Sequence, residues 1–217
     1  MEFSENHQLL TLCRSTDMAA IVGQEPHWRQ LLFALGQAGW LRLSLLAMSN
    51  RLKGKWALVT GASSGFGAET ARQLADLGAN LLLGARREDR LGQVAAECLE
   101  RGAASAHVHK LDVADTASVN AFADWAKTTA DRVDVLINNA GGAHGVERVE
   151  DGRDDDWEAM FQSNALGILR VSRAVLPLMK PHPGGIILNI GSIAGRVAYE
   201  GGSAYCASKA AERSITK

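Results

Sequence analysis

The sequence predicts an α/β fold in which a doubly wound parallel sheet forms a single domain. From residue 56 onward, short and continuously apolar runs alternate with amphipathic helical patterns, as is typical of parallel strands covered by helices on both faces. A glycine-rich turn, GASSGFG, directly follows the first apolar run and opens the first helical pattern. The chain has 217 residues, of which 47% are hydrophobic, and this suffices for one substantial core.

Each expected strand is an apolar run, and each expected helix is an amphipathic segment that follows such a run. Strands are expected at residues 56–60, 80–85, 106–111, 133–141 and 185–192, and helices at 68–77, 87–101, 116–129, from 157 towards 179, and from near Ser203. Gly78 and Gly102 stand where glycine commonly ends a helix. Aspartates at 154–156 complement the positive end of the fourth helix. Right-handed crossovers between such strands give a Rossmann-type fold, whose ligands bind beyond the carboxyl ends of the strands.

The composition argues against several classes of protein. The formal net charge is -1 and 22% of residues are charged, so neither nucleic acid nor an anionic surface is expected as a partner. The three cysteines, Cys13, Cys98 and Cys206, are widely spaced, which predicts neither a disulfide framework nor a metal site and suits a cytoplasmic location. His107 and His109 lie in an expected strand, where a structural role is favoured over metal ligation.

Residues 1–50 are treated as an N-terminal extension, and the working domain as residues 51–217. Residues 31–48 are apolar, but a glutamine and an arginine interrupt them, and a membrane-spanning helix needs about 20 predominantly apolar residues. No small-residue cleavage site follows, which argues against a signal peptide. Three alternatives remain: an amphipathic appendage helix, a membrane anchor, or sequence outside the working domain. Met48 begins MSNRLKGKWALVTG, a natural start for a domain, and favours the third.

The glycine-rich turn predicts a site for a pyrophosphate. Gly61, Gly65 and Gly67 permit a tight turn and let the backbone approach phosphates, which the N-terminus of the following helix stabilises. Ser63 and Ser64 lie in the same turn and could bond phosphate oxygens. The turn therefore predicts a dinucleotide cofactor.

The end of the second expected strand indicates which dinucleotide. An NAD site usually has an acidic residue there, whereas this sequence has Arg86 and Arg87. A guanidinium pairs with the 2′-phosphate of NADP, which a carboxylate would repel. NADP is therefore expected, although Arg87 could instead only begin a solvated helix.

Ser192, Tyr205 and Lys209 form a candidate catalytic group. Tyr205 and Lys209 are four residues apart in an expected helix, so they share one face. A free tyrosine ionises only near about pH 10, but a neighbouring ammonium favours the phenolate and makes tyrosine a usable acid or base. The hydroxyl of Ser192 can then polarise a substrate carbonyl. Tyrosine and lysine at this spacing are otherwise just a solvated helix face.

Several motifs together resemble the short-chain dehydrogenase/reductase family from about residue 53 to residue 217. The motifs are TGASSGFG, LDV at 111–113, NNAG at 138–141, Asn164, Ser192, Tyr205 and Lys209. Within the family, GARREDRL, AVLPLM and YEGGSAYCASK are most similar to NADP-dependent 3-hydroxy acid (serine-type) dehydrogenases.

The resemblance implies a role for each catalytic residue. Tyr205 would give its proton to the carbonyl oxygen during reduction, and Lys209 would favour the phenolate and bond the nicotinamide ribose. Ser192 would orient the carbonyl. Asn164 would hold a water that links Lys209 to solvent, although an asparagine within a helix can instead be a packing or kink residue.

The resemblance also implies a cofactor site. Asp112 and Val113 would line the adenine pocket, and Asn139, Ala140 and Gly141 would pack beside the adenosine ribose. Cys206 is expected to be a packed helix residue. The whole expected cofactor site comprises Gly61, Ser63, Ser64, Gly65, Phe66, Gly67, Arg86, Arg87, Asp112, Val113, Asn139, Ala140, Gly141, Tyr205 and Lys209.

The expected activity is hydride transfer between NADP(H) and a hydroxyl or carbonyl carbon. A small 3-hydroxy acid such as serine or allo-threonine is the first substrate expected, and a ketone, steroid or retinoid carbonyl the second. The alternative is a truncated, catalytically silent fragment that binds NADP or a partner. The resemblance further implies a homo-oligomer, either a dimer or a tetramer.

The family's sheet continues past the YxxxK helix with two more strands and a substrate-covering segment. This sequence ends at Lys217, soon after that motif. We therefore expect the domain to lack its last strands and to fold poorly alone, or to be a fragment, a splice product or an incomplete gene model.

Overall fold

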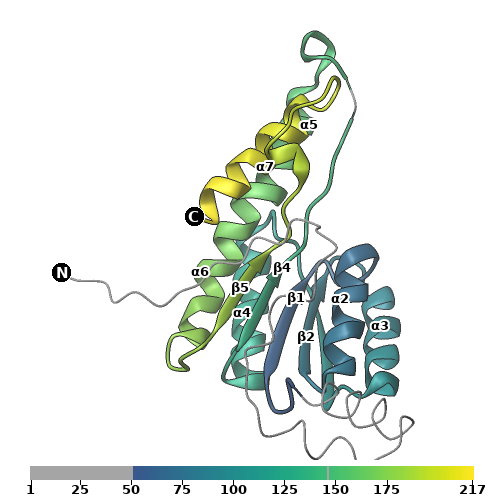
Figure 1. The fold of residues 1–217 in the computed structure, drawn as a ribbon, viewed down its shortest axis with the longest axis vertical. Helices are drawn as coiled ribbons and strands as arrows, with labels where there is room; N and C mark the ends of the chain where they lie inside the picture. The colour runs from purple at the N-terminus through teal and green to yellow at the C-terminus, as the bar shows by residue number, and fades with distance from the viewer. Residues whose placement is uncertain (1–50, 146) are drawn as a thin grey trace, which may run out of the picture.

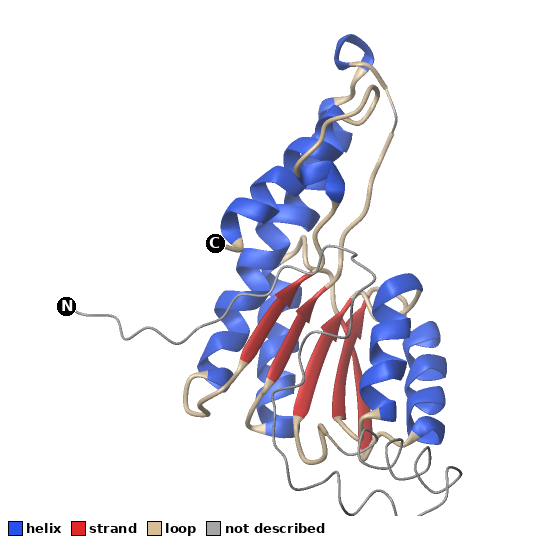
Figure 2. Cartoon of the chain, viewed as in Figure 1, coloured by secondary structure: helices blue, strands red, loops and turns tan. Residues whose placement is uncertain are grey.

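A computed structural model describes residues 51–145 and 147–217, which fold around one parallel sheet (Figures 1 and 2). The alternatives for residues 1–50 lie outside the described part. The strands are β1 (Trp56–Thr60), β2 (Asn80–Ala85), β3 (Ser105–Lys110), β4 (Val135–Asn138) and β5 (Ile186–Asn189). They lie in the order β3-β2-β1-β4-β5, and each neighbouring pair is parallel. The predicted doubly wound α/β fold is confirmed.

The helices alternate with the strands along the chain. They are α2 (Gly65–Asp76), α3 (Glu88–Arg101), α4 (Thr116–Ala130), α5 (Asp154–Phe161), α6 (Gly167–Met179) and α7 (Ser203–Ile215). A π-helical segment, Gln162–Leu166, joins α5 to α6, and 3-10 turns lie at Val149–Asp151 and Ile193–Gly195. Gly102 ends α3 in the left-handed conformation, with φ at 113°, as its position predicts.

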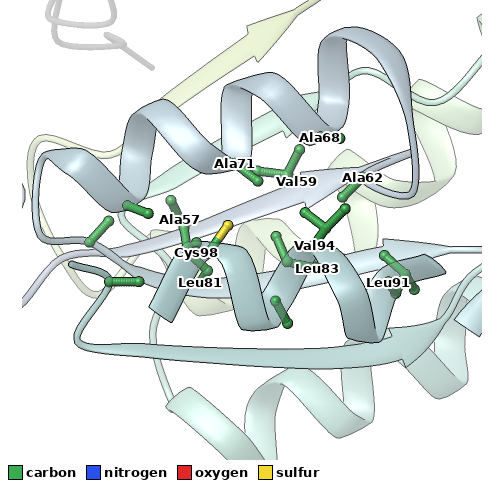
Figure 3. Close-up of a cluster of buried hydrophobic side chains, with 14 of the residues drawn as sticks. Ala57, Val59, Ala62, Ala68, Ala71, Leu81, Leu83, Leu91, Val94 and Cys98 are labelled. Atoms are coloured by element: carbon green, nitrogen blue, oxygen red, sulfur yellow. The ribbon is translucent and has the colours of Figure 1, made fainter. Parts of the chain in front are cut away.

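Side chains of the central strands alternate between two cores because successive residues of a strand point to opposite faces. Ala57 and Val59 of β1 belong to the core under α2 and α3 (Figure 3). Leu58 belongs to the core formed with α4 and α6, around Phe122 and Val171. The sheet is thus covered on both faces, which explains why its central strands are apolar throughout.

Two cysteines lie in the part of the chain that the structure describes. Cys98 and Cys206 are free and buried. Burial raises the pKa of the Cys98 thiol to about 11, so this side chain behaves as a small apolar residue.

The structure corrects several predicted boundaries. β3 begins and ends one residue earlier than expected, and β5 spans Ile186–Asn189 instead of 185–192. Among the described residues, β5 pairs only with β4. This strand itself spans four residues instead of 133–141, so their ladder ends at Asn138 and Asn189. The helix expected from 157 towards 179 begins at Asp154 and is interrupted by the π-helical segment.

The described residues, 51–145 and 147–217, include no helix that is both long and apolar enough to cross a bilayer.

Candidate active site

A cleft of about 690 Å³ opens where the carboxyl ends of the strands meet. All strand arrows in Figure 2 point towards this end of the sheet, and α5 and α7 project beyond the arrowheads. With the exception of Gly67, every residue of the expected cofactor site lines the cleft, and Ser192 lines it too. The parallel topology therefore brings together residues as far apart in sequence as Gly61 and Lys209.

The glycine-rich turn lies against the end of β4. Gly61 has φ at +68°, which favours glycine. A side chain at Gly67 would place its Cβ 2.5 Å from the carbonyl oxygen of Gly61 and 2.4 Å from Nδ2 of Asn139. Gly67 thus permits close packing beneath the turn and does not line the cleft.

Thr60 joins the turn to β4, and the sequence analysis missed it. Its Oγ1 accepts hydrogen bonds from the backbone N–H groups of Asn139 and Ala140, both at 3.0 Å. Asn139 Nδ2 donates to the carbonyl oxygen of Thr60 at 2.9 Å. The position of Thr60 directly before the glycine turn was the only available signal. Asn139 therefore serves the scaffold through its amide and lines the cleft as well.

Arg87 does more than begin a solvated helix. Its Nη2 donates to the hydroxyl oxygens of Ser63 at 3.1 Å and Ser64 at 2.7 Å. The guanidinium therefore lies beside the N-terminal end of α2, whose free N–H groups already favour anions. Arg86 lines the same part of the cleft, which makes it a region of positive charge.

Asp112 and Val113 lie at the end of β3. Oδ1 of Asp112 accepts from the N–H of Ala114 at 3.0 Å, so one carboxylate oxygen orders the turn. Val113 packs against Gly167 in α6, where a Cβ would come within 2.9 Å of Cγ2 of Val113. Both residues are held in place at the cleft wall by these contacts.

Tyr205 and Lys209 lie on α7, with Nζ of Lys209 6.0 Å from the centroid of the Tyr205 ring. Lys209 is only 9% exposed, and its Nζ donates to the carbonyl oxygen of Ile190 at 2.9 Å. Ser192 follows β5, and its Oγ accepts from the N–H of Ala194 at 3.2 Å. Gly195 lets this turn approach α7, since a Cβ there would lie 2.6 Å from the carbonyl oxygen of Lys209.

Asn164 is fully buried in the π-helical segment and does not line the cleft. Its Nδ2 donates to the Gly142 carbonyl at 2.8 Å and to Ser208 Oγ at 3.0 Å, and its Oδ1 accepts from the Gly142 N–H at 2.9 Å. Both amide hydrogens are used by protein groups, so the side chain braces the loop after β4 against α7. The water-holding role expected for Asn164 stays a prediction. Ser208 was missed by the sequence analysis, and only its place beside Lys209 could have indicated it.

Glu212 is the second group that accepts a hydrogen bond from Lys209, after the Ile190 carbonyl. The sequence analysis missed it as well. Its Oε2 lies 2.6 Å from Nζ of Lys209, and the residue is 1% exposed. Burial raises the pKa of the Glu212 carboxyl, against the opposing effect of the Lys209 ammonium. Opposite charges three residues apart on a helix are a recognised pair, so the spacing could have revealed it.

A smaller hollow of about 30 Å³ borders Tyr205 on the side of the loop after β4. Its lining includes His144, Arg148, Trp157 and Tyr199. Arg196 lines neither this hollow nor the main cleft. Among the residues that the structure describes, no group of three or more metal-ligating side chains gathers.

Comparison with known proteins agrees with this geometry. An "uncharacterized oxidoreductase" of Staphylococcus saprophyticus is 41% identical over 168 residues, which cover 77% of this chain and 67% of the relative. An NADP-dependent 3-hydroxy acid dehydrogenase of Schizosaccharomyces pombe is 42% identical over 168 residues, covering 77% of this chain and 65% of the relative. The chain thus spans about two thirds of the length of the curated relatives it matches.

A solved structure shares the fold at similar identity. A metagenomic short-chain oxidoreductase in complex with NADP superposes with a TM-score of 0.73 at 35% identity, covering 76% of this chain and 75% of the other. The family model described as short chain dehydrogenase matches residues 55–217, which are nearly all of the residues that the structure describes. The chain therefore belongs to the short-chain dehydrogenase/reductase family.

Proposed function

We propose that this chain is an NADP-dependent oxidoreductase that transfers a hydride between the nicotinamide and a hydroxyl or carbonyl carbon. The observation that carries the proposal is that Ser192, Tyr205 and Lys209 line the same cleft as the glycine-rich turn. Bound NADP(H) would supply or accept the hydride. The chain's own residues would then move the proton.

The residues present fit this cofactor. Gly61 and Gly65 line the cleft without side chains, so the backbone of the turn is open there to a pyrophosphate. The Arg87 guanidinium beside Ser63 and Ser64 offers a fork of donors to a phosphate. Relatives and neighbours named for NADP support the same choice.

The proton would pass through Tyr205. In reduction, its hydroxyl donates to the substrate oxygen while Ser192 holds that oxygen by a hydrogen bond. In oxidation, the phenolate takes the proton back. Lys209 on the same helix face supplies the positive charge that favours the phenolate.

For the substrate, we propose a small 3-hydroxy acid. The relative from Schizosaccharomyces pombe carries this activity in its name, and the hollow beside Tyr205 includes the basic side chains of His144 and Arg148. A carboxylate on the substrate could pair with either. We also propose a cytoplasmic homo-oligomer, a dimer or a tetramer. Leu166, at the end of the π-helical segment, and Leu169, in α6, support this assembly because they are large apolar side chains that are each 38% exposed.

The test is nicotinamide absorbance with a panel of 3-hydroxy acids and ketones, using the full chain and Tyr205→Phe. We expect turnover to fall by about 10²- to 10⁴-fold in the variant, because the proton donor is lost. NADPH affinity, measured by fluorescence, should change little, which also shows that the variant folds. NADPH binding by the unaltered chain without turnover of any substrate would instead identify a catalytically silent protein.

A further inference from the structure

Glu212 is a buried acid that the proposed reaction does not use. It lies on α7, three residues after Lys209, and is 1% exposed. Oε2 lies 2.6 Å from Nζ of Lys209, whereas Oε1 is buried with no hydrogen-bond partner among the described residues. A buried carboxylate with one unpaired oxygen is costly, so an apolar side chain would fill this position more favourably.

The ion pair changes what Lys209 can do. An ammonium has three N–H donors, and two of them are directed at the Ile190 carbonyl and at Glu212. One donor is left for the cleft. The negative charge of Glu212 also offsets the positive charge of Lys209 where that charge acts on Tyr205, 6.0 Å away at its ring centroid.

We infer that Glu212 is a positioning residue: its carboxylate holds the Lys209 ammonium at the end of β5 and weakens the stabilisation of the Tyr205 phenolate. Removing the negative charge of Glu212 should consequently favour the Tyr205 phenolate. Any effect on turnover rests on the proposed function, but the effect on Tyr205 ionisation does not.

Other polar groups lie near the Lys209–Glu212 ion pair, and the test variants must leave these groups unchanged. Ser192 lies after β5, Tyr205 on α7, and the Asn164–Ser208 hydrogen bond joins the π-helical segment to α7. Of these side chains, Tyr205 is the ionisable one, and those of Ser192, Asn164 and Ser208 stay neutral. The cleft also contains these charged or titratable side chains: His144, Arg86, Arg87 and Asp112.

The chain offers a direct readout, because it has only two tyrosines, Tyr199 and Tyr205. In a Tyr199→Phe background, the ultraviolet absorbance of tyrosinate reports Tyr205 alone, with neither cofactor nor substrate present. We expect Glu212→Gln to shift Tyr205 ionisation to lower pH by about one unit, because an uncompensated ammonium favours the phenolate. Glu200→Gln, which removes the same charge from a residue that pairs with Arg148 on the surface, should cause no shift.

A second readout is the pH dependence of alcohol oxidation, whose acidic limb should shift in the same direction in Glu212→Gln. Glu212→Leu serves as a second variant in case the glutamine variant does not fold, as judged by circular dichroism, and should shift both curves alike. Titration and rate curves that superimpose on those of the unaltered protein, or that move to higher pH, would overturn the inference. If the unaltered chain shows neither turnover nor NADPH binding, the proposed function fails, while the tyrosinate titration still decides the role of Glu212.

Discussion

Individual residues determine the cleft in two ways: a glycine leaves room for close backbone packing, and an arginine adds positive charge. At Gly67, a single added carbon would meet the backbone of Gly61. Arg87 contributes through its side chain instead. The side chain extends from the start of α3 to Ser63 and Ser64 on the glycine turn. A positive charge thereby lies beside the end of α2 that already favours anions.

Replacing Arg87 with alanine tests whether this charge selects the cofactor. Loss of hydrogen bonds to a charged group costs about 1.5–3 kcal/mol, so we expect NADPH affinity to fall by about 10- to 100-fold. NADH affinity should change little, because NADH has no 2′-phosphate. Both are measured by nucleotide fluorescence titration. Arg90→Ala, which removes an exposed arginine from the same helix, is the matched control and should leave both affinities unaltered. An equal loss for NADH and NADPH would contradict selection by Arg87.

At the scale of elements, the amino ends of β1 and β4 are held together by one carboxylate. Asp134, 7% exposed, accepts from the N–H of Trp56 at 2.9 Å, from Lys55 Nζ at 3.1 Å, and from Arg132. Burial alone would raise the pKa of Asp134, but the hydrogen bonds from Arg132, Trp56 and Lys55 outweigh it, so the pKa lies below its usual range. The ionised form therefore stabilises the fold.

The charge of Asp134 gives a pH-dependent prediction. Since the pKa is lowered by folding, its stabilisation is present above the unfolded value of about 3.9 and is lost as pH falls through the folded value. We expect Asp134→Asn to lower the free energy of unfolding at pH 7 by about 1.5–3 kcal/mol, in urea denaturation. The difference from the unaltered protein should shrink below about pH 4. Asp131→Asn, at a neighbouring exposed acid, should have little effect; a pH-independent loss in Asp134→Asn would contradict the ionic explanation.

Local patterns predicted the elements well, and their errors have physical causes. The strand and helix types follow from periodicities that need only neighbouring residues. Strand ends depend instead on where a partner strand stops, which is why β5 is shorter than its apolar run. The π-helical segment around Asn164 also depends on distant groups, because Gly142 and Ser208 bind the asparagine side chain there.

At the scale of the whole molecule, one cleft joins segments from nearly the full length of the described chain. The glycine turn, the ends of β2, β3, β4 and β5, and α7 all contribute to it. A ligand that spans these segments binds only the folded state, so its binding energy adds to the free energy of unfolding. The core beneath α2 and α3 contains Cys98 (Figure 3), which offers a probe of that free energy.

NADPH should protect Cys98 from thiol reagents. The thiol is buried and its pKa is raised to about 11, so labelling requires the core to open. At about 100 times its dissociation constant, NADPH should add about 2.7 kcal/mol and slow labelling by about 100-fold. Peptide mass spectrometry at Cys98 measures the rate. The Arg87→Ala variant, at the same NADPH concentration, should be protected much less; equal labelling of the unaltered protein with and without NADPH would show that the ligand does not stabilise this core.

The sequence alone determined the alternation of strands and helices, the glycine turn, the basic end of β2, and the Tyr205–Lys209 spacing, because each depends on residues close together in the chain. Tertiary structure decided which polar groups meet across long separations: Thr60 with Asn139, Asp134 with Trp56, and Asn164 with Gly142. Tertiary structure also decided which charged side chains are buried. Glu212 stands three residues from Lys209 in any helix, but only the packing of α7 takes its carboxylate out of water and confines it to that ammonium.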